Sequence, residues 1–283
     1  MKRILLPSDL SALSDYAYDF AHRISSLTGA VIHVFSVIPA PPRAVFDKDG
    51  SLKNDNASDY SGWFAKKVER DKKLKNWARD KEDVVSTEVK IGRVREDIIN
   101  YVDANDIDLI IMGTGGAVGM DEALRGTNAE YIINHASVPT ICLKCDRSNI
   151  VINDILLVSD FQEDTPIKLE ALRLLRTIFN ARLHFLKVVT KEDFESSKDI
   201  HERMDRFRDQ NDLSNAIYHI YNDESVEKGI INFSTESGIA FLAVGTHQRK
   251  GFSRLFKQSV TDGIVNHIYQ PVLCFPVIKS EDQ

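Results

Sequence analysis

Residues Ile4–Asp9 read ILLPSD, and residues Ile155–Asp160 read ILLVSD, 151 positions later (155 − 4). At the same offset, Ile32–Val34 (IHV) corresponds to Leu183–Phe185 (LHF). A short apolar run that ends in serine and aspartate is typical of a buried strand that leads into a helix. Because the correspondence recurs at so long a period, we predict a duplicated domain and not a stack of short repeats.

The later part of each half matches at a shorter offset. Ile110–Thr114 (IIMGT) corresponds to Leu242–Thr246 (LAVGT), and Pro139–Cys142 (PTIC) to Pro271–Cys274 (PVLC), both 132 positions apart (242 − 110). The offsets differ by 19 residues (151 − 132), which lie after the second strand of the first half. This part of the chain includes a charged helix predicted over Ser61–Lys81. We interpret it as a solvated helix packed on the sheet, with a lid or docking segment as the alternative.

The composition is that of a globular protein without a membrane-spanning segment. Of the 283 residues, 43% are hydrophobic and 28% are charged, and no apolar run reaches the roughly 18 residues of a transmembrane helix. A formal net charge of −6 argues against a surface that coats nucleic acid. Cys142 and Cys145 form a CxxC pair without a second ligand pair, so we expect structural thiols and a cytoplasmic location.

Apolar runs alternate with helical patterns in both halves, which predicts parallel β-α units covered on both faces. The chain is therefore expected to form two tandem α/β domains with doubly wound, Rossmann-like sheets over residues 1–147 and 148–283, joined around Lys144–Asn153. Such sheets bind ligands at the carboxyl ends of their strands. In the first half, strands are expected over Ile4–Pro7, Val31–Val37, Val84–Ile91, Leu109–Met112 and Val138–Leu143, and helices over Ser11–Leu27, Val94–Ala104 and Thr127–His135.

A glycine-rich loop follows the fourth predicted strand. Gly113, Gly116 and Gly126 are separated by two and nine residues, and Thr127 follows the last glycine. Glycines let backbone N–H groups approach an anion closely, and the amino end of a helix that begins at Thr127 would favour phosphate. The alternative is structural, because Thr127–Glu130 is also a capping-box pattern and glycine-rich turns after strands are common.

Asp9 follows the first predicted strand, whose end would lie near this loop in a doubly wound sheet. Its carboxylate can accept a hydrogen bond from a ribose hydroxyl or help to hold a divalent metal on the phosphates. Asp9 can equally cap the helix that begins near Ser11.

Together these motifs resemble the universal stress protein family in its tandem form, over nearly the whole chain. The resemblance rests on Ile4–Ser11, His33–Val34 and Asp108–Pro139, where the Gly-x2-Gly-x9-Gly-(Ser/Thr) spacing matches the family's ATP-binding signature. It implies an adenine nucleotide alpha hydrolase-like fold that binds ATP with Mg2+. The residues that it assigns to the nucleotide are Pro7, Ser8 and Asp9 beside the adenosine, Val34 at the adenine, Met112, Gly113 and Gly116 along the loop, and Gly126, Thr127, Asn128 and Ala129 at the phosphates.

The resemblance also bears on phosphate contacts and on assembly. The histidine and arginine that are frequent in the family's loop are replaced here by Gly115 and Ala117, so backbone groups would make more of the phosphate contacts. The resemblance suggests that the two domains pair through the strands Val138–Leu143 and Val272–Val277 as a pseudo-dimer. Both strands are apolar, and apolar sheet edges are usually paired or covered. Whether whole chains also form a homodimer stays open.

The matching loop of the second half has lost two glycines. Gln248 replaces Gly116, and Gln258 replaces Gly126. A side chain in a left-handed backbone conformation costs about 1–2 kcal/mol, and glutamine also fills space that a phosphate needs. We therefore predict one competent site, in the first half, and a mainly structural second half. The basic residues around the altered loop are either solvated or bind another anion: Arg249, Lys250, Arg254 and Lys257.

Three functions are consistent with these features. We favour a regulatory, stress-response protein that senses ATP through its first half. A slow ATPase or an adenylate-forming enzyme is the second, although the loop lacks a Gly-Lys-Ser/Thr element and a clearly placed general base. A scaffold that acts through domain pairing, or that binds a ligand other than a nucleotide, is the third.

Overall fold

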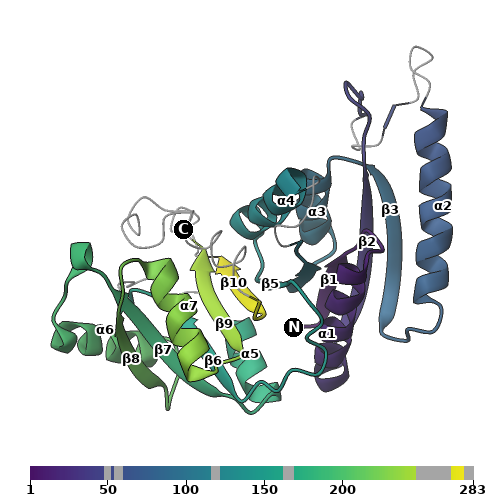
Figure 1. Cartoon of the computed structure of the whole chain (residues 1–283). Helices are drawn as coiled ribbons and strands as arrows, with labels where there is room; N and C mark the ends of the chain where they lie inside the picture. The colour runs from purple at the N-terminus through teal and green to yellow at the C-terminus, as the bar shows by residue number, and fades with distance from the viewer. Residues whose placement is uncertain (48–51, 54–59, 116–121, 162–168, 247–268, 277–283) are drawn as a thin grey trace.

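The computed structural model describes residues 1–47, 52–53, 60–115, 122–161, 169–246 and 269–276 (Figure 1). Its strands form one ten-stranded sheet in the order β3-β2-β1-β4-β5-β10-β9-β6-β7-β8. The first five strands in this order belong to the N-terminal half of the chain and the other five to the C-terminal half. The predicted α/β class, with a mostly parallel sheet that spans two domains, is confirmed.

In the N-terminal half, β1 pairs in parallel with both β2 and β4, so the direction of winding reverses beside β1. This reversal is the switch point at which doubly wound sheets bind ligands. The elements of this half are β1 (Arg3–Pro7), α1 (Ala12–Thr28), β2 (Val31–Pro39), α2 (Ser61–Ala78), β3 (Val84–Gly92), α3 (Val94–Ala104), β4 (Leu109–Gly113), α4 (Glu122–His135) and β5 (Thr140–Leu143).

The C-terminal half repeats this plan, with β6 between β7 and β9. Its elements are β6 (Asp154–Val158), α5 (Glu170–Ile178), β7 (Arg182–Val189), the short 3-10 helix η1 (Lys191–Asp193), α6 (Ser197–Gln210), β8 (Ile217–Asn222), α7 (Val226–Ser237), β9 (Phe241–Thr246) and β10 (Val272–Pro276).

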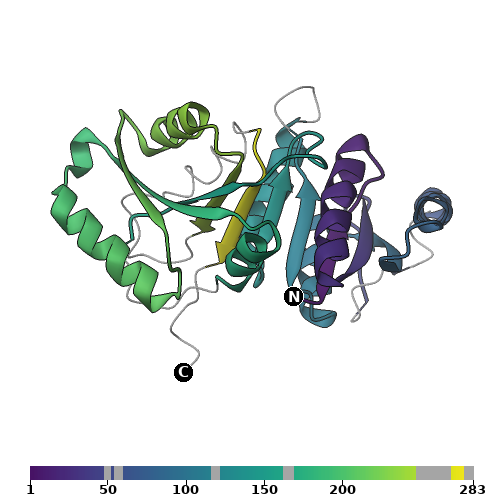
Figure 2. The same ribbon diagram turned by 90° about the horizontal axis from the view of Figure 1, so that it is seen from below.

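Buried side chains form two hydrophobic clusters, because successive residues of a strand point to opposite faces of the sheet. Ile4 and Leu6 of β1 belong to the cluster that contains α1, α2, α5 and α6, whereas Leu5 belongs to the cluster that contains α3, α4 and α7. The helices α2 and α6 lie at opposite outer ends of the molecule (Figures 1 and 2). Among the described helices, none is long and apolar enough to cross a bilayer.

The two halves join through β5 and β10, which pair antiparallel. Ile141 lies opposite Leu273, and Cys142 lies opposite Val272. The predicted pairing of the domains through their last strands is thus confirmed, and the two domains share one sheet. Antiparallel pairing of these strands also means that neither forms an exposed edge.

Several predicted boundaries were wrong, among them the end of the helix predicted over Ser61–Lys81, which stops at Ala78. The helix α4 begins at Glu122 rather than at Thr127, so Gly126 and Thr127 lie in its second turn and not at its amino end. Glutamate, alanine and leucine are strong helix formers, and this propensity outweighs the roughly 1 kcal/mol that a glycine costs inside a helix. The strand β5 begins at Thr140 rather than at Val138, because Pro139 has no N–H to donate to a sheet.

Candidate functional site

A pocket of about 140 Å3 lies at the carboxyl ends of β1 and β4, at the switch point of the N-terminal half. This volume is smaller than the roughly 300–1,000 Å3 of sites that enclose a whole drug-sized ligand, so the pocket suits a ring-sized group. It brings together seven of the residues that the sequence predicted: Pro7, Ser8, Asp9, Met112, Gly113, Asn128 and Ala129.

Short-range hydrogen bonds shape the turn that follows β1. The Asp9 carboxylate accepts from the Ser11 N–H at 3.0 Å and from the Ser14 hydroxyl at 2.9 Å. The Ser8 hydroxyl oxygen accepts from the N–H of Leu10 at 3.1 Å, and Leu10 adopts a left-handed φ of 63°. Asp9 is not the N-cap of α1, which is Ser11, and its bond to the Ser11 N–H closes a turn just before the helix. These bonds hold an exposed carboxylate at the edge of the pocket.

Gly113 ends β4 where the first turn of α1 crosses it. A β-carbon on Gly113 would lie 2.5 Å from the carbonyl oxygen of Leu13 and 2.7 Å from its carbonyl carbon. Both atoms are backbone, so a larger residue could fit only if the start of α1 moved. The sequence predicted a loop glycine that approaches an anion, and the structure adds a packing reason for glycine at this position.

The sequence analysis missed the apolar wall of the pocket. Phe35 and Val37 contribute from β2, Val94 and Ile98 from α3, and Ile132 from α4. The sequence did contain one indication of this wall, because Val94 and Ile98 are four residues apart and therefore share one face of a helix. An apolar wall with an aromatic ring suits a flat heterocycle that also carries polar groups.

Val34 does not line the pocket. Its side chain is fully buried in the other layer, in the cluster that contains Phe20 and Ala21 of α1. Because side chains alternate along a strand, its neighbour Phe35 and then Val37 face the pocket instead. The position of Val34 therefore gives no support to a contact between its side chain and an adenine.

Two arginines that the sequence analysis did not single out stand beside the site. Arg95 of α3 donates from Nε to Oδ1 of Asn128 at 2.9 Å. Arg70 of α2 donates from Nη1 to the carbonyl oxygen of Asp9 at 3.3 Å and to the hydroxyl of Ser36 at 3.2 Å. These bonds orient two guanidinium groups, which are always charged, close to residues of the pocket.

Several predicted residues fall outside the described part of the chain. Gly116 is one of them, and Gly126 and Thr127 are described only as part of α4. The altered loop of the C-terminal half, with Gln248 and Gln258, also lies outside. The same holds for its basic residues Arg249, Lys250, Arg254 and Lys257. The phosphate cradle and the loss of the second site therefore stay predictions.

The described residues offer no obvious metal centre of their own. Within those ranges, no group of three or more histidine, cysteine, aspartate or glutamate side chains is arranged to hold an ion. Among the described residues no disulfide joins Cys142, Cys145 and Cys274, and Cys142 and Cys274 are buried in β5 and β10. A metal at the pocket would thus need ligands from a bound molecule as well as from Asp9.

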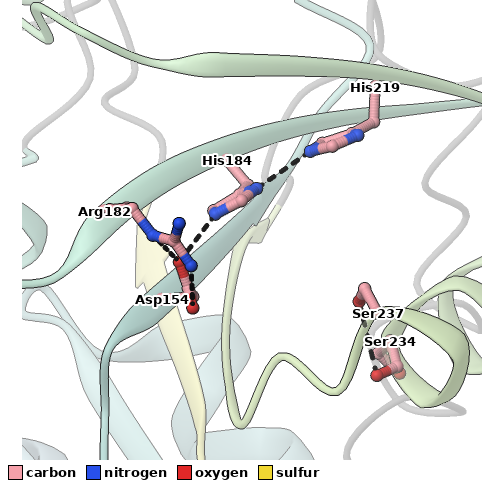
Figure 3. Close-up of polar contacts among 6 residues, drawn as sticks. All are labelled: Asp154, Arg182, His184, His219, Ser234 and Ser237. Atoms are coloured by element: carbon pink, nitrogen blue, oxygen red, sulfur yellow. Dashed lines mark hydrogen bonds and ion pairs between the residues drawn. The ribbon is translucent and has the colours of Figure 1, made fainter.

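A second polar cluster lies near the amino ends of β6 and β7, whereas sheets of this kind bind ligands at the carboxyl ends of their strands (Figure 3). His184 is buried between Asp154 and His219, with Nε2 2.8 Å from Oδ1 of Asp154 and Nδ1 2.9 Å from Nε2 of His219. Arg182 donates to both carboxylate oxygens of Asp154, and these bonds hold the pKa of that carboxyl below its ordinary value. The imidazole–imidazole bond needs one ring to donate and the other to accept, so the two facing nitrogens cannot both carry a proton.

Acidification is therefore expected to destabilise the C-terminal half. Burial, with a contribution from His184, lowers the pKa of His219 below its ordinary value. Because folding favours neutral His219, the unfolded chain binds more protons than the folded protein once the pH falls below about 6.5. The stabilisation should be complete above that pH and should be lost as the pH falls through the lowered pKa. Urea unfolding measured at about pH 7.5 and again at about pH 5.5 tests this.

The variant His219→Phe isolates this contribution. It keeps a ring beside Phe233, 4.8 Å away between centroids, but cannot titrate. It leaves Nδ1 of His184 without its partner, so its stability at neutral pH should fall by about 1–3 kcal/mol. The decisive readout is the slope of the unfolding free energy against pH, which should be smaller than in the wild type. His33, whose pKa burial also lowers, is unchanged in both proteins. An equal slope in the variant would contradict the assignment.

Comparison with known proteins agrees with the fold. A sequence profile of the universal stress protein family matches residues 1–144 and 152–276. A universal stress protein of Methanocaldococcus jannaschii is 27% identical over 150 residues, which cover 50% of this chain and 82% of that protein. The crystal structure of a universal stress protein from Archaeoglobus fulgidus matches with a TM-score of 0.72 at 18% identity, over 97% of this chain and 98% of that one. The chain therefore belongs to the universal stress protein family and contains the family's domain twice.

Proposed function

We propose that this protein is an ATP-binding regulatory protein whose N-terminal half holds one nucleotide with Mg2+ on its phosphates. The observation that carries the proposal is the pocket at the switch point, where Ser8, Asp9, Met112 and Asn128 converge beside an apolar wall. Polar groups in small number around an apolar pocket are typical of small-molecule sites. Membership of the universal stress protein family makes an adenine nucleotide the first ligand to test.

The pocket offers separate places for the parts of a nucleotide. Its apolar wall and its limited volume suit the adenine ring. Asp9 stands exposed at the edge, and a carboxylate oxygen is the kind of ligand that Mg2+ accepts beside phosphate oxygens. Arg95 of α3, which is bonded to Asn128, supplies a positive charge next to the same wall. The loop after β4 itself has Gly115 and Ala117 in place of the family's frequent basic residues.

The proposal can be tested by measuring how much ATP stabilises the wild type and a variant whose pocket is filled by a larger side chain. ATP with Mg2+ at about 100 times its dissociation constant should stabilise the folded wild type by about 2.7 kcal/mol and raise the unfolding temperature by about 5 °C or more. The variant Val37→Trp puts a large ring into the wall of the pocket and should abolish this shift. The matched control Val85→Trp, at a position on β3 that is 56% exposed, should keep it. A full ATP-dependent shift in Val37→Trp would refute a nucleotide in this pocket.

The same measurements distinguish the other functions. Since β5 and β10 join the two halves by backbone pairing, a wild type that no nucleotide stabilises would point to a scaffold. Release of phosphate from ATP above background, absent in Asp9→Asn, would point to a slow ATPase. The asparagine keeps an oxygen for the hydrogen bonds from Ser11 and Ser14 and removes only the charge.

A further inference from the structure

The strand β8 forms one outer edge of the ten-stranded sheet. Its sequence, IYHIYN, is rich in β-branched and aromatic residues, and every one of its residues is at least partly exposed. Ile217 is 40% exposed. Among the described strands, β7 alone pairs with β8. An edge of this kind presents unpaired backbone groups that can accept another strand.

The strand at the opposite edge of the sheet, β3, carries charged residues that disfavour pairing with another strand, and β8 carries none. The edge strand β3 carries Glu88 and Lys90, which are the charges that proteins commonly use to keep an edge from pairing. Between Ile217 and Asn222, the strand β8 contains no lysine, arginine, aspartate or glutamate. The contrast between two equivalent strands of a duplicated domain shows that the charges are not required by the fold.

The backbone of β8 has a defined outward side. Asp223, directly after the strand, donates its N–H to the carbonyl oxygen of Val189 on the β7 side at 3.1 Å. Since N–H groups alternate in direction along a strand, those of His219 and Tyr221 also point towards β7. The N–H groups of Ile220 and Asn222 then point outward, away from the rest of the sheet.

We propose that β8 pairs antiparallel with β8 of a second copy of this chain. The resulting two-fold dimer would have one continuous sheet that crosses from one copy to the other at β8. A two-fold axis between two copies of a strand places residues of the same sequence opposite one another. Because β8 carries no lysine, arginine, aspartate or glutamate, no register of this pair places like charges opposite one another. Its two tyrosines and two isoleucines are suited to cross-strand contacts on both faces. The β5–β10 join shows that antiparallel pairing of two edges already connects the halves of this fold. The proposal is independent of nucleotide binding.

Sedimentation equilibrium of the full chain from about 1 to about 100 µM tests the dimer, because its population follows mass action. The wild type should become dimeric within this range. Ile217→Lys adds a charge at the exposed start of β8 and should weaken dimerisation by about tenfold or more. The matched control Val85→Lys adds the same charge on the β3 edge, at an exposed position, and should leave the dimer unchanged.

A backbone variant and hydrogen exchange distinguish strand pairing through β8 from non-specific association. Ile220→Pro removes an outward N–H without removing a bond to β7, and it should make the protein monomeric with an unchanged far-UV spectrum. Should that variant misfold, exchange in the wild type still decides: the amide of Ile220 should become protected as the protein concentration rises, while that of Tyr221 is protected throughout. A monomer at the highest concentration, an unprotected Ile220 amide in a dimer, or a dimer that only Val85→Lys dissociates would overturn the proposal.

Discussion

The variant Phe20→Ala is expected to lower the free energy of unfolding by about 3–5 kcal/mol. Phe20 lies on α1 of the N-terminal half and is fully buried. Its ring stacks on Phe241 of β9, 6.3 Å away between centroids, and lies 6.5 Å from the ring of Phe179. Both partners belong to the C-terminal half, so truncation leaves a cavity in the part of the core that the halves share.

The same variant should uncouple the two halves. Both tryptophans of the chain, Trp63 and Trp77, lie on α2, so fluorescence reports on the N-terminal half alone, whereas circular dichroism reports on both. In urea, the two signals should change together in the wild type and separately in Phe20→Ala. Phe194→Ala is the matched control, because that ring is 84% exposed and its loss should change stability by less than about 0.5 kcal/mol. Coincident transitions and an unchanged midpoint in Phe20→Ala would show that this contact does not couple the halves.

Gly113→Ala is expected to destabilise the protein by about 1–3 kcal/mol, although it adds a single methyl group. The new carbon would meet the backbone of Leu13 at 2.5 Å, and relief requires a shift of the start of α1. Because Ser14, which holds Asp9, lies in the same turn, the edge of the pocket should be displaced as well. Urea denaturation gives the stability, and the ATP-dependent thermal shift reports on the pocket.

Gly62→Ala provides the control for Gly113→Ala. Gly62 lies in the first turn of α2, and a β-carbon there would meet no atom of the described residues within 4 Å beyond its own turn of helix. Alanine should therefore be neutral or stabilise the helix by up to about 1 kcal/mol. Equal effects at the two positions would mean that the close approach of Leu13 to Gly113 is relieved without cost.

Much of the fold could be predicted from local patterns. The repeated ILLPSD and ILLVSD stretches became β1 and β6 with the turns that follow them, because an uninterrupted apolar run is buried on both faces of a parallel sheet. Gly29 ends α1, just after the predicted end at Leu27, with a left-handed φ of 73° that glycine adopts without strain. The pairing of the last strands was predicted from the family resemblance, and it agrees with the need to cover apolar edges.

The site was predicted less completely, for identifiable reasons. The residues beside strand ends, such as Ser8 and Met112, converge because parallel strands end at one edge of the sheet. The apolar wall was not found, since Phe35 and Ile98 look like any other core residues in the sequence. The start of α4 was misplaced because a glycine was read as a boundary, although the residues before it favour a helix.

The sequence by itself determined the duplicated plan and the positions of the strands, since burial and periodicity can be recognised from neighbouring residues. Only the tertiary structure decided that Val34 faces α1 while Phe35 faces the pocket, and that the backbone of Leu13 requires glycine at position 113. It alone placed Phe20 against Phe241 of the other half. The physical reason is that a local pattern shows that a residue is buried, whereas the layer it enters and the backbone that crosses it depend on segments far away in the chain.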